Sequence, residues 1–119
     1  MESREVNIKL LKAFPEIALE YKEEIAWQDG DDTGSHIVYG DVFVPFIKKQ
    51  FKEERDNILE RIFDYLEMLL AENDEYINEV VAFSVIESLM FDDEIDKAKI
   101  IAVARNKTLS IIKEIADKV

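Results

Sequence analysis

Oxygen-bearing side chains are concentrated in one segment of the chain, residues 28–41, with the sequence Gln-Asp-Gly-Asp-Asp-Thr-Gly-Ser-His-Ile-Val-Tyr-Gly-Asp. Asp29, Asp31 and Thr33 stand at alternate positions and Gly34 follows them, as at the start of a Ca²⁺-binding EF-hand loop. The twelfth position of that loop requires a bidentate glutamate, whereas this chain has Gly40 there. Because the strongest ligand is missing, the sequence favours an acidic turn, and we expect no metal and no other cofactor.

A second kind of metal chemistry is suggested by paired carboxylates on either side of this segment. Glu20 and Glu23 precede it, Glu53 and Asp56 follow it, and a spacing of three residues places each pair on one helical face. All-α nucleotide pyrophosphohydrolases hold Mg²⁺ in this way, so a magnesium-dependent phosphohydrolase is our alternative function. About a third of the chain is charged, however, so such pairs arise by chance. Asp56 also suits the N-cap of the following helix.

Acid–base and nucleophilic catalysis lack a complete set of residues. His36 is the only histidine, and its neighbour Ser35 is too close in sequence to be an obvious nucleophile partner. Cysteine is absent, which excludes disulfides, thiolate zinc sites and cysteine nucleophiles. We therefore predict no catalytic residue and expect a protein that is not an enzyme.

The same segment has the composition of a protein-binding surface. Trp27 closes the preceding helix and Tyr39 leads into the next one, and aromatic residues beside charged ones are favoured at interface hot spots. The aromatic residues could instead anchor the loop on the core, as we expect for Phe43 and Phe46. The candidate binding residues are Trp27, Asp29, Asp31, Asp32, His36, Tyr39 and Asp41.

The charge of the chain limits its partners. The formal net charge is −12, which disfavours nucleic acids, and residues 73–94 carry seven acids and no base. This acidic block either keeps the protein solvated or attracts a basic protein. No apolar run approaches the ~18 residues that a membrane span needs, and the first residues are too charged for a signal peptide. We expect a cytoplasmic protein that binds no membrane.

The elements that must position these residues are helices. Over 57–71, apolar residues recur every three or four positions, whereas 75–91 is apolar on nearly all sides and is expected to be central. The short break between them, with Asp74 as N-cap, predicts an antiparallel hairpin. Pro45 would be tolerated in the first turn of a helix that runs from Asp41 to about residue 54. A further helix is predicted to start at Pro15. Two more are predicted to have their N-caps at Asp92 or Asp93 and at Thr108.

These patterns predict an all-α protein with a single domain, 1–119. About six helices in antiparallel hairpin pairs would form a short HEAT-like solenoid, and an irregular helical bundle is the alternative. The oligomeric state stays open.

Several segments carry a resemblance to a known family. They are 13–16 (Ala-Phe-Pro-Glu), 34–42 with Pro45, 61–67 (Arg-Ile-Phe-Asp-Tyr-Leu-Glu), 73–76 and 80–87. Together, from about Phe14 to Glu87, they resemble a family of small acidic bacterial proteins that carry a domain of unknown function. Some of its members look like immunity proteins encoded beside secreted polymorphic toxins.

The resemblance implies a helical fold with HEAT-like pairing, and it marks His36, Gly40 and Asp41 as positions typical of the family. Our leading hypothesis is therefore a non-enzymatic interaction module, an immunity or antitoxin-like protein. It would neutralise a basic partner, such as a toxin, by occluding it with an acidic surface.

Overall fold

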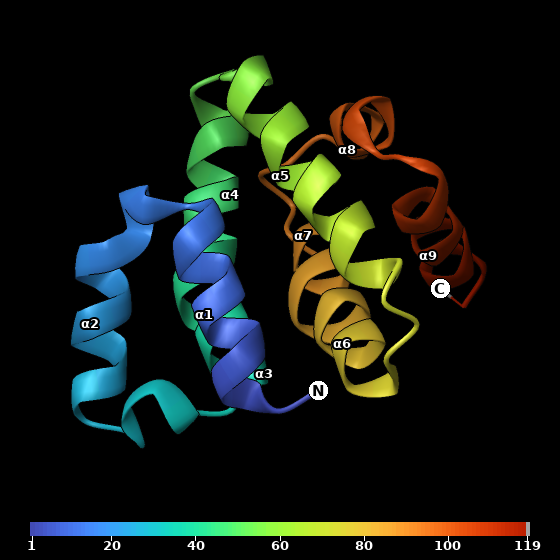
Figure 1. Cartoon of the computed structure of the whole chain (residues 1–119). Coiled ribbons are helices and arrows are strands. Elements are labelled where there is room, and N and C mark those ends of the chain that lie inside the picture. Colours follow the sequence, from blue (N-terminus) through green and yellow to red (C-terminus); the bar gives the residue numbers. More distant parts are fainter. Residues whose placement is uncertain (119) are drawn as a thin grey trace.

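The computed structural model describes residues 1–118, which form seven helices and no strand, so the predicted all-α class is confirmed (Figure 1). α1 and α2 lie at one end of the molecule, α8 and α9 lie at the other, and the remaining helices fill the middle. Among these residues, no helix is both long and apolar enough to cross a bilayer. The bounds are α1 Ser3–Ala13, α2 Ala18–Ala26, α5 Asp56–Leu70, α8 Lys97–Val103 and α9 Asn106–Asp117.

The other two helices each contain a π-helical segment. α3 (Ser35–Val38) continues through η3 (Tyr39–Phe43) into α4 (Val44–Lys52), and α6 (Glu75–Glu79) continues through η4 (Val80–Ile86) into α7 (Glu87–Met90). Short 3₁₀ turns, η1 (Pro15–Ile17) and η2 (Gly30–Asp32), precede α2 and α3.

The helix formed by α6, η4 and α7 is central, as its all-round apolar pattern predicts. It contacts α3, α4, α5, α8 and α9 as well as η3. Ile77, Val80, Val81, Val85, Ile86 and Leu89 are fully buried along it. Phe83 and Phe91 are the exceptions, because both rings stay more than half exposed.

The prediction that a helix starts at Asp41 is wrong, because this helix begins at Ser35 and Pro45 lies in its interior. A proline there removes one hydrogen bond and crowds the carbonyl four residues earlier. The wider turn at Tyr39–Phe43 lies immediately before it and gives that carbonyl more room. At the start of the helix, the backbone N–H of Ser35 donates to the hydroxyl of Tyr76 at 3.0 Å.

Other predicted helix starts have mixed outcomes. Asp74 is the N-cap of α6 and accepts from the backbone N–H of Ile77 at 3.0 Å, as predicted. Asp56 is inside α5, whose N-cap is Arg55. α8 starts at neither Asp92 nor Asp93, because Asp96 caps it by accepting from Ala98 N–H at 2.9 Å.

Thr108 is the third residue of α9 and not its cap. Its hydroxyl accepts from the backbone N–H of Arg105 at 2.8 Å. The Glu67 carboxylate of α5 accepts from the N–H groups of Lys107 and Thr108, both at 2.8 Å. A negative charge at a helix N-terminus is favourable, so this contact fixes α9 on α5.

Candidate functional site

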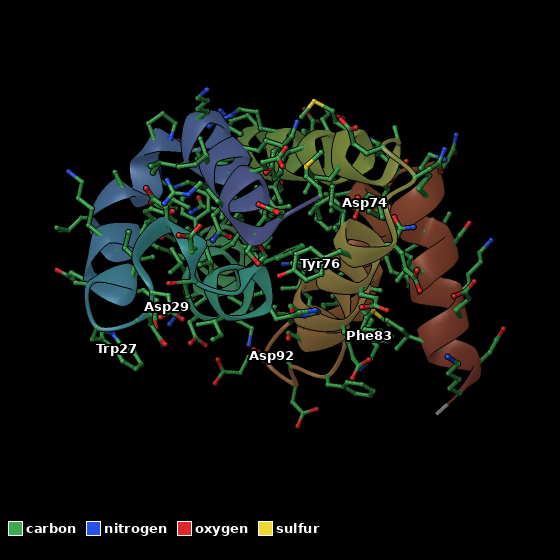
Figure 2. All side chains as sticks on the ribbon, turned by 60° about the horizontal axis from the view of Figure 1, so that its bottom comes forward. Trp27, Asp29, Asp74, Tyr76, Phe83 and Asp92 are labelled. Carbon is green, nitrogen blue, oxygen red and sulfur yellow. The ribbon has the colours of Figure 1, made fainter. Side chains whose placement is uncertain are left out.

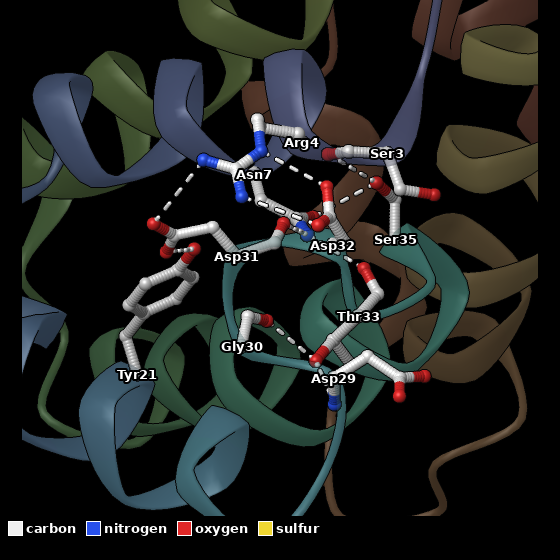
Figure 3. A network of polar contacts seen from close by, with 10 residues as sticks. All are labelled: Ser3, Arg4, Asn7, Tyr21, Asp29, Gly30, Asp31, Asp32, Thr33 and Ser35. Carbon is white, nitrogen blue, oxygen red and sulfur yellow. Dashed lines mark hydrogen bonds and ion pairs between the residues drawn. The ribbon is translucent and has the colours of Figure 1, made fainter.

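The turn between α2 and α3 is held by Asn7 of α1 (Figure 3). The Asn7 side chain is fully buried, and its amide donates to the backbone carbonyls of Asp31 at 3.1 Å and Thr33 at 2.7 Å. The Ser35 hydroxyl donates to the side-chain amide oxygen of Asn7, Oδ1, at 2.8 Å. One buried amide therefore fixes both the turn and the first residue of α3.

Two of the three acidic side chains of the turn, Asp31 and Asp32, already have partners within the protein, whereas Asp29 is exposed and its carboxylate forms no ion pair within residues 1–118. Arg4 of α1 donates to both carboxylate oxygens of Asp32, at 2.9 and 3.2 Å, and lies 3.9 Å from Asp31. The Tyr21 hydroxyl donates to Asp31 at 2.7 Å. Thr33, the third oxygen of the EF-hand pattern, donates to the carbonyl of Gly30 at 2.6 Å. Gly30 has φ of +61°, a conformation that favours glycine. Two of the three side chains that the calcium pattern needs, Asp31 and Thr33, are thus used to build the turn.

The pair of Arg4 and Asp32 makes stability dependent on pH. The hydrogen bond from Arg4, together with its charge, lowers the pKa of the Asp32 carboxyl below its ordinary value of 3.8. The stabilisation is therefore present above that value and is lost as the pH falls through the lowered pKa. We expect Asp32→Asn to have a lower urea midpoint than the parent protein at pH 7, and a difference that shrinks as the pH is lowered below 3.8 towards pH 2.

Asp41→Asn is the matched control, because Asp41 is exposed and forms no ion pair within residues 1–118. Its midpoint should equal that of the parent at both pH values. A difference between Asp32→Asn and the parent that is the same at pH 2 and pH 7 would contradict the assignment.

Tyr39 is not part of a binding surface, and its prediction as a binding residue is wrong. Its ring is fully buried, and its hydroxyl donates to the carbonyl of Val6 at 2.8 Å and lies 2.8 Å from the Tyr65 hydroxyl. Burial raises the pKa of the Tyr39 hydroxyl well above its ordinary value. Phe43 is also fully buried and Phe46 packs against the core, as expected for both. The π-helical turn that begins at Tyr39 points its ring inward.

The remaining candidate binding residues are exposed but dispersed. Trp27, 70 % exposed, and Asp29 lie near each other at the α2 end (Figure 2). His36 faces the central helix, where its Nδ1 lies 2.7 Å from the Ser84 hydroxyl and its ring meets Tyr76 edge-on. Asp41 lines a depression of about 410 Å³ on another part of the surface. The segment 28–41 is therefore a scaffold element and not one continuous patch.

The four carboxylates of the magnesium alternative are not gathered around one point. Glu20 and Glu53 line the same depression as Asp41, but the Glu53 carboxylate already pairs with Arg55 at 3.2 Å. Asp56 lines a different depression, and Glu23 lines neither of the two. Within residues 1–118, no group of three or more histidine, aspartate or glutamate side chains is arranged to hold a metal ion. The geometry gives this alternative no support.

A groove between the central helix and α9 combines exposed aromatic rings with free carboxylates. It consists of two adjoining depressions, of about 550 and 220 Å³, that share Ala82, Phe83, Ile111 and Glu114. Phe83 and Phe91 are 59 % and 56 % exposed. Phe83 lies on the side of the central helix that faces α9 (Figure 2). We call this feature the α6–α9 groove; its other lining residues are Leu70, Asn73, Glu75, Asn78, Glu79, Glu87, Lys107, Ser110, Ile115 and Lys118.

The carboxylates beside this groove are unpaired in the described chain, although Lys107 and Lys118 also line it. Glu75, Glu79, Glu87 and Glu114 form no ion pair within residues 1–118, in contrast to Asp31 and Asp32. The sequence shows a local signal for three of them, since Glu75 and Glu79 are four residues apart and Glu87 follows Phe83 by four, and residues four apart are neighbours on a helix surface. The apolar pattern of this helix predicts its central position but does not show which side stays open, so the groove is not predicted from the sequence.

The fold and the groove define an all-helical protein with an open apolar surface and an acidic border. The chain belongs to a family whose model is described as Domain of unknown function (DUF7674), which matches residues 8–117. No curated protein and no solved structure matches the chain.

Proposed function

We propose that the protein is a non-enzymatic interaction module of the immunity or antitoxin type, which binds a basic protein partner through an acidic surface. The observation that carries this proposal is the exposure of Phe83 and Phe91 beside carboxylates that form no ion pair in the described chain. Aromatic residues in a depression are typical hot spots of protein interfaces. Charge complementarity accelerates the encounter and selects a basic partner.

The proposal includes two finer features that support the role. One is a HEAT-like stacking of helix pairs, for which the short connection between α5 and α6, residues 71–74, is the supporting feature. The other is a cytoplasmic location in a bacterial cell, which suits a chain without cysteine.

Capture experiments with matched baits test the proposal. The full chain, Phe83→Asp and Met68→Asp would each be immobilised and exposed to a lysate of the source cells, and bound proteins would be identified by mass spectrometry. Met68 is the control because it is exposed to a similar degree, 54 %, but lines neither part of the groove.

We expect the parent and Met68→Asp baits to capture a basic protein that Phe83→Asp does not retain. Loss of a hot-spot aromatic residue costs about 2 kcal/mol or more, which is about a thirtyfold loss of affinity. The proposal is wrong if all three baits capture the same proteins, or if the protein that depends on Phe83 is acidic.

A further inference from the structure

The α6–α9 groove has the length of a short helix. Its two depressions adjoin, so that Asn73 and Lys107 lie toward one end and Phe91 and Lys118 toward the other. Phe83 lies in the π-helical segment η4, and Phe91 follows the last residue of α7, eight positions further along the chain. The opposite wall, α9, has 12 residues and is about 18 Å long. An occupant that fills the groove is therefore about three helical turns long.

The chemistry of the walls favours a helical occupant over an extended one. Both walls are helices, whose backbone groups bond internally, and residues 1–118 contain no strand edge that could pair with a peptide. An extended segment in the groove would leave N–H and C=O groups against Phe83, Ala82 and Ile111 without partners. An α-helix satisfies its own backbone and presents only side chains.

The groove is acidic on balance, because four glutamates line it against two lysines, Lys107 and Lys118, and this balance favours a basic occupant. Glu79 and Glu87 lie on the central helix, eight residues apart, and Glu114 lies on α9 across the groove. Two turns of a docked helix span about the same distance, so lysine or arginine residues seven or eight positions apart would face Glu79 and Glu87. A second copy of this chain is disfavoured, because its net charge of −12 would be brought against an acidic groove.

We propose that the α6–α9 groove binds a basic amphipathic helix of about three turns, with its apolar face on Phe83 and Phe91 and its cationic residues on the flanking glutamates. This inference rests on the proposed function and names the part of the partner that is recognised.

Three synthetic peptides of equal charge test the inference. The first is an amphipathic helix of about 14 residues made of leucine, lysine and alanine. The second has the same composition in a scrambled order, and the third has the first sequence with a central proline, which breaks the helix. Binding to the full chain, Phe83→Asp, Glu79→Lys and Met68→Asp would be measured by fluorescence anisotropy. Circular dichroism would verify the helix content of each variant.

We expect the amphipathic peptide to bind the parent at least tenfold more tightly than either control peptide. Phe83→Asp and Glu79→Lys should each weaken that binding, and Met68→Asp should leave it unchanged. If the three peptides bind the parent with equal affinity and Phe83→Asp binds all of them more weakly, the occupant need not be helical. That result overturns this inference but leaves the proposed function standing.

Two other results overturn the inference in different ways. If Phe83→Asp leaves all peptide binding unchanged, or if no peptide binds, this groove does not take a basic helix, and the capture experiment decides the proposed function separately. If sedimentation shows a dimer that Phe83→Asp dissociates, the occupant is a second copy of the chain.

Discussion

Replacement of Asn7 by alanine is expected to lower the free energy of unfolding by about 3 kcal/mol. The substitution removes the amide donor from the buried carbonyl of Thr33 and from the half-buried carbonyl of Asp31. It also removes the 2.8 Å acceptor of the Ser35 hydroxyl, which keeps only the Ser3 carbonyl at 3.3 Å. A buried polar group without a partner costs about 1–3 kcal/mol. The three groups are neighbours, so their separate costs do not simply add, and solvent or small shifts reduce the total destabilisation. Urea denaturation followed by circular dichroism would measure the loss.

Asn7→Asp separates the hydrogen bonds from the shape of the side chain. It keeps the volume of asparagine but cannot donate to the two carbonyls when ionised. Burial beside carbonyl oxygens disfavours the charged form, so the pKa of the introduced carboxyl should be raised in the folded state. Its destabilisation should therefore be smaller at pH 3 than at pH 7. An equal loss at the two pH values, or a loss below about 1 kcal/mol for Asn7→Ala, would show that Asn7 does not hold the turn.

The sequence predicted those helices whose positions are fixed by side chains within the helix itself or next to its ends. The apolar spacing of 57–71 corresponds to α5, the Asp74 cap starts α6, and Pro15 starts the η1 turn that leads into α2. In each case, the side chain that fixes the element is part of that element or is its immediate neighbour. These features follow from helical periodicity and capping alone.

Features fixed by residues far away in the chain were not predictable in this way. The N-terminus of α3 is satisfied by the Tyr76 hydroxyl, 41 residues away, and that of α9 by Glu67. Without such a partner, Asp41 looked like the better start. The acids of the turn similarly looked free because Arg4, their counter-ion, belongs to another helix.

The candidate site lies in the α6–α9 groove and not in the segment 28–41, and contacts between distant parts of the chain are again the reason. In the segment 28–41, Asp31 and Asp32 are bound by Tyr21 and Arg4 of neighbouring helices, whereas the glutamates beside the α6–α9 groove form no ion pair in the described chain. Whether the Phe83 side of the central helix is buried depends on where α9 packs. α9 lies beside this face and leaves it open, which a single helix sequence does not specify.

Two aromatic residues, Trp27 just before the 28–41 segment and Tyr39 near its end, should differ strongly in their effect on stability when mutated. Tyr39→Ala is expected to lower the free energy of unfolding by about 4 kcal/mol, because truncation of a buried aromatic ring typically costs about 3–5 kcal/mol. The cavity would lie between Phe43 and Tyr65, the first of which packs edge-on against the Tyr39 ring. Trp27→Ala should change the free energy of unfolding by less than about 0.5 kcal/mol, since its ring is largely exposed.

Tyr39→Phe divides the effect of Tyr39 into its two physical parts. It keeps the ring in the core and removes only the hydroxyl, so the Val6 carbonyl loses its donor and the Tyr65 hydroxyl loses a partner. We expect a loss of about 1–2 kcal/mol, which lies between the parent and Tyr39→Ala. Chemical denaturation of the four proteins under one set of conditions would measure this order. Equal stability of Tyr39→Ala and Trp27→Ala would mean that the π-helical turn does not place Tyr39 in the core, and the residue would return to the binding surface.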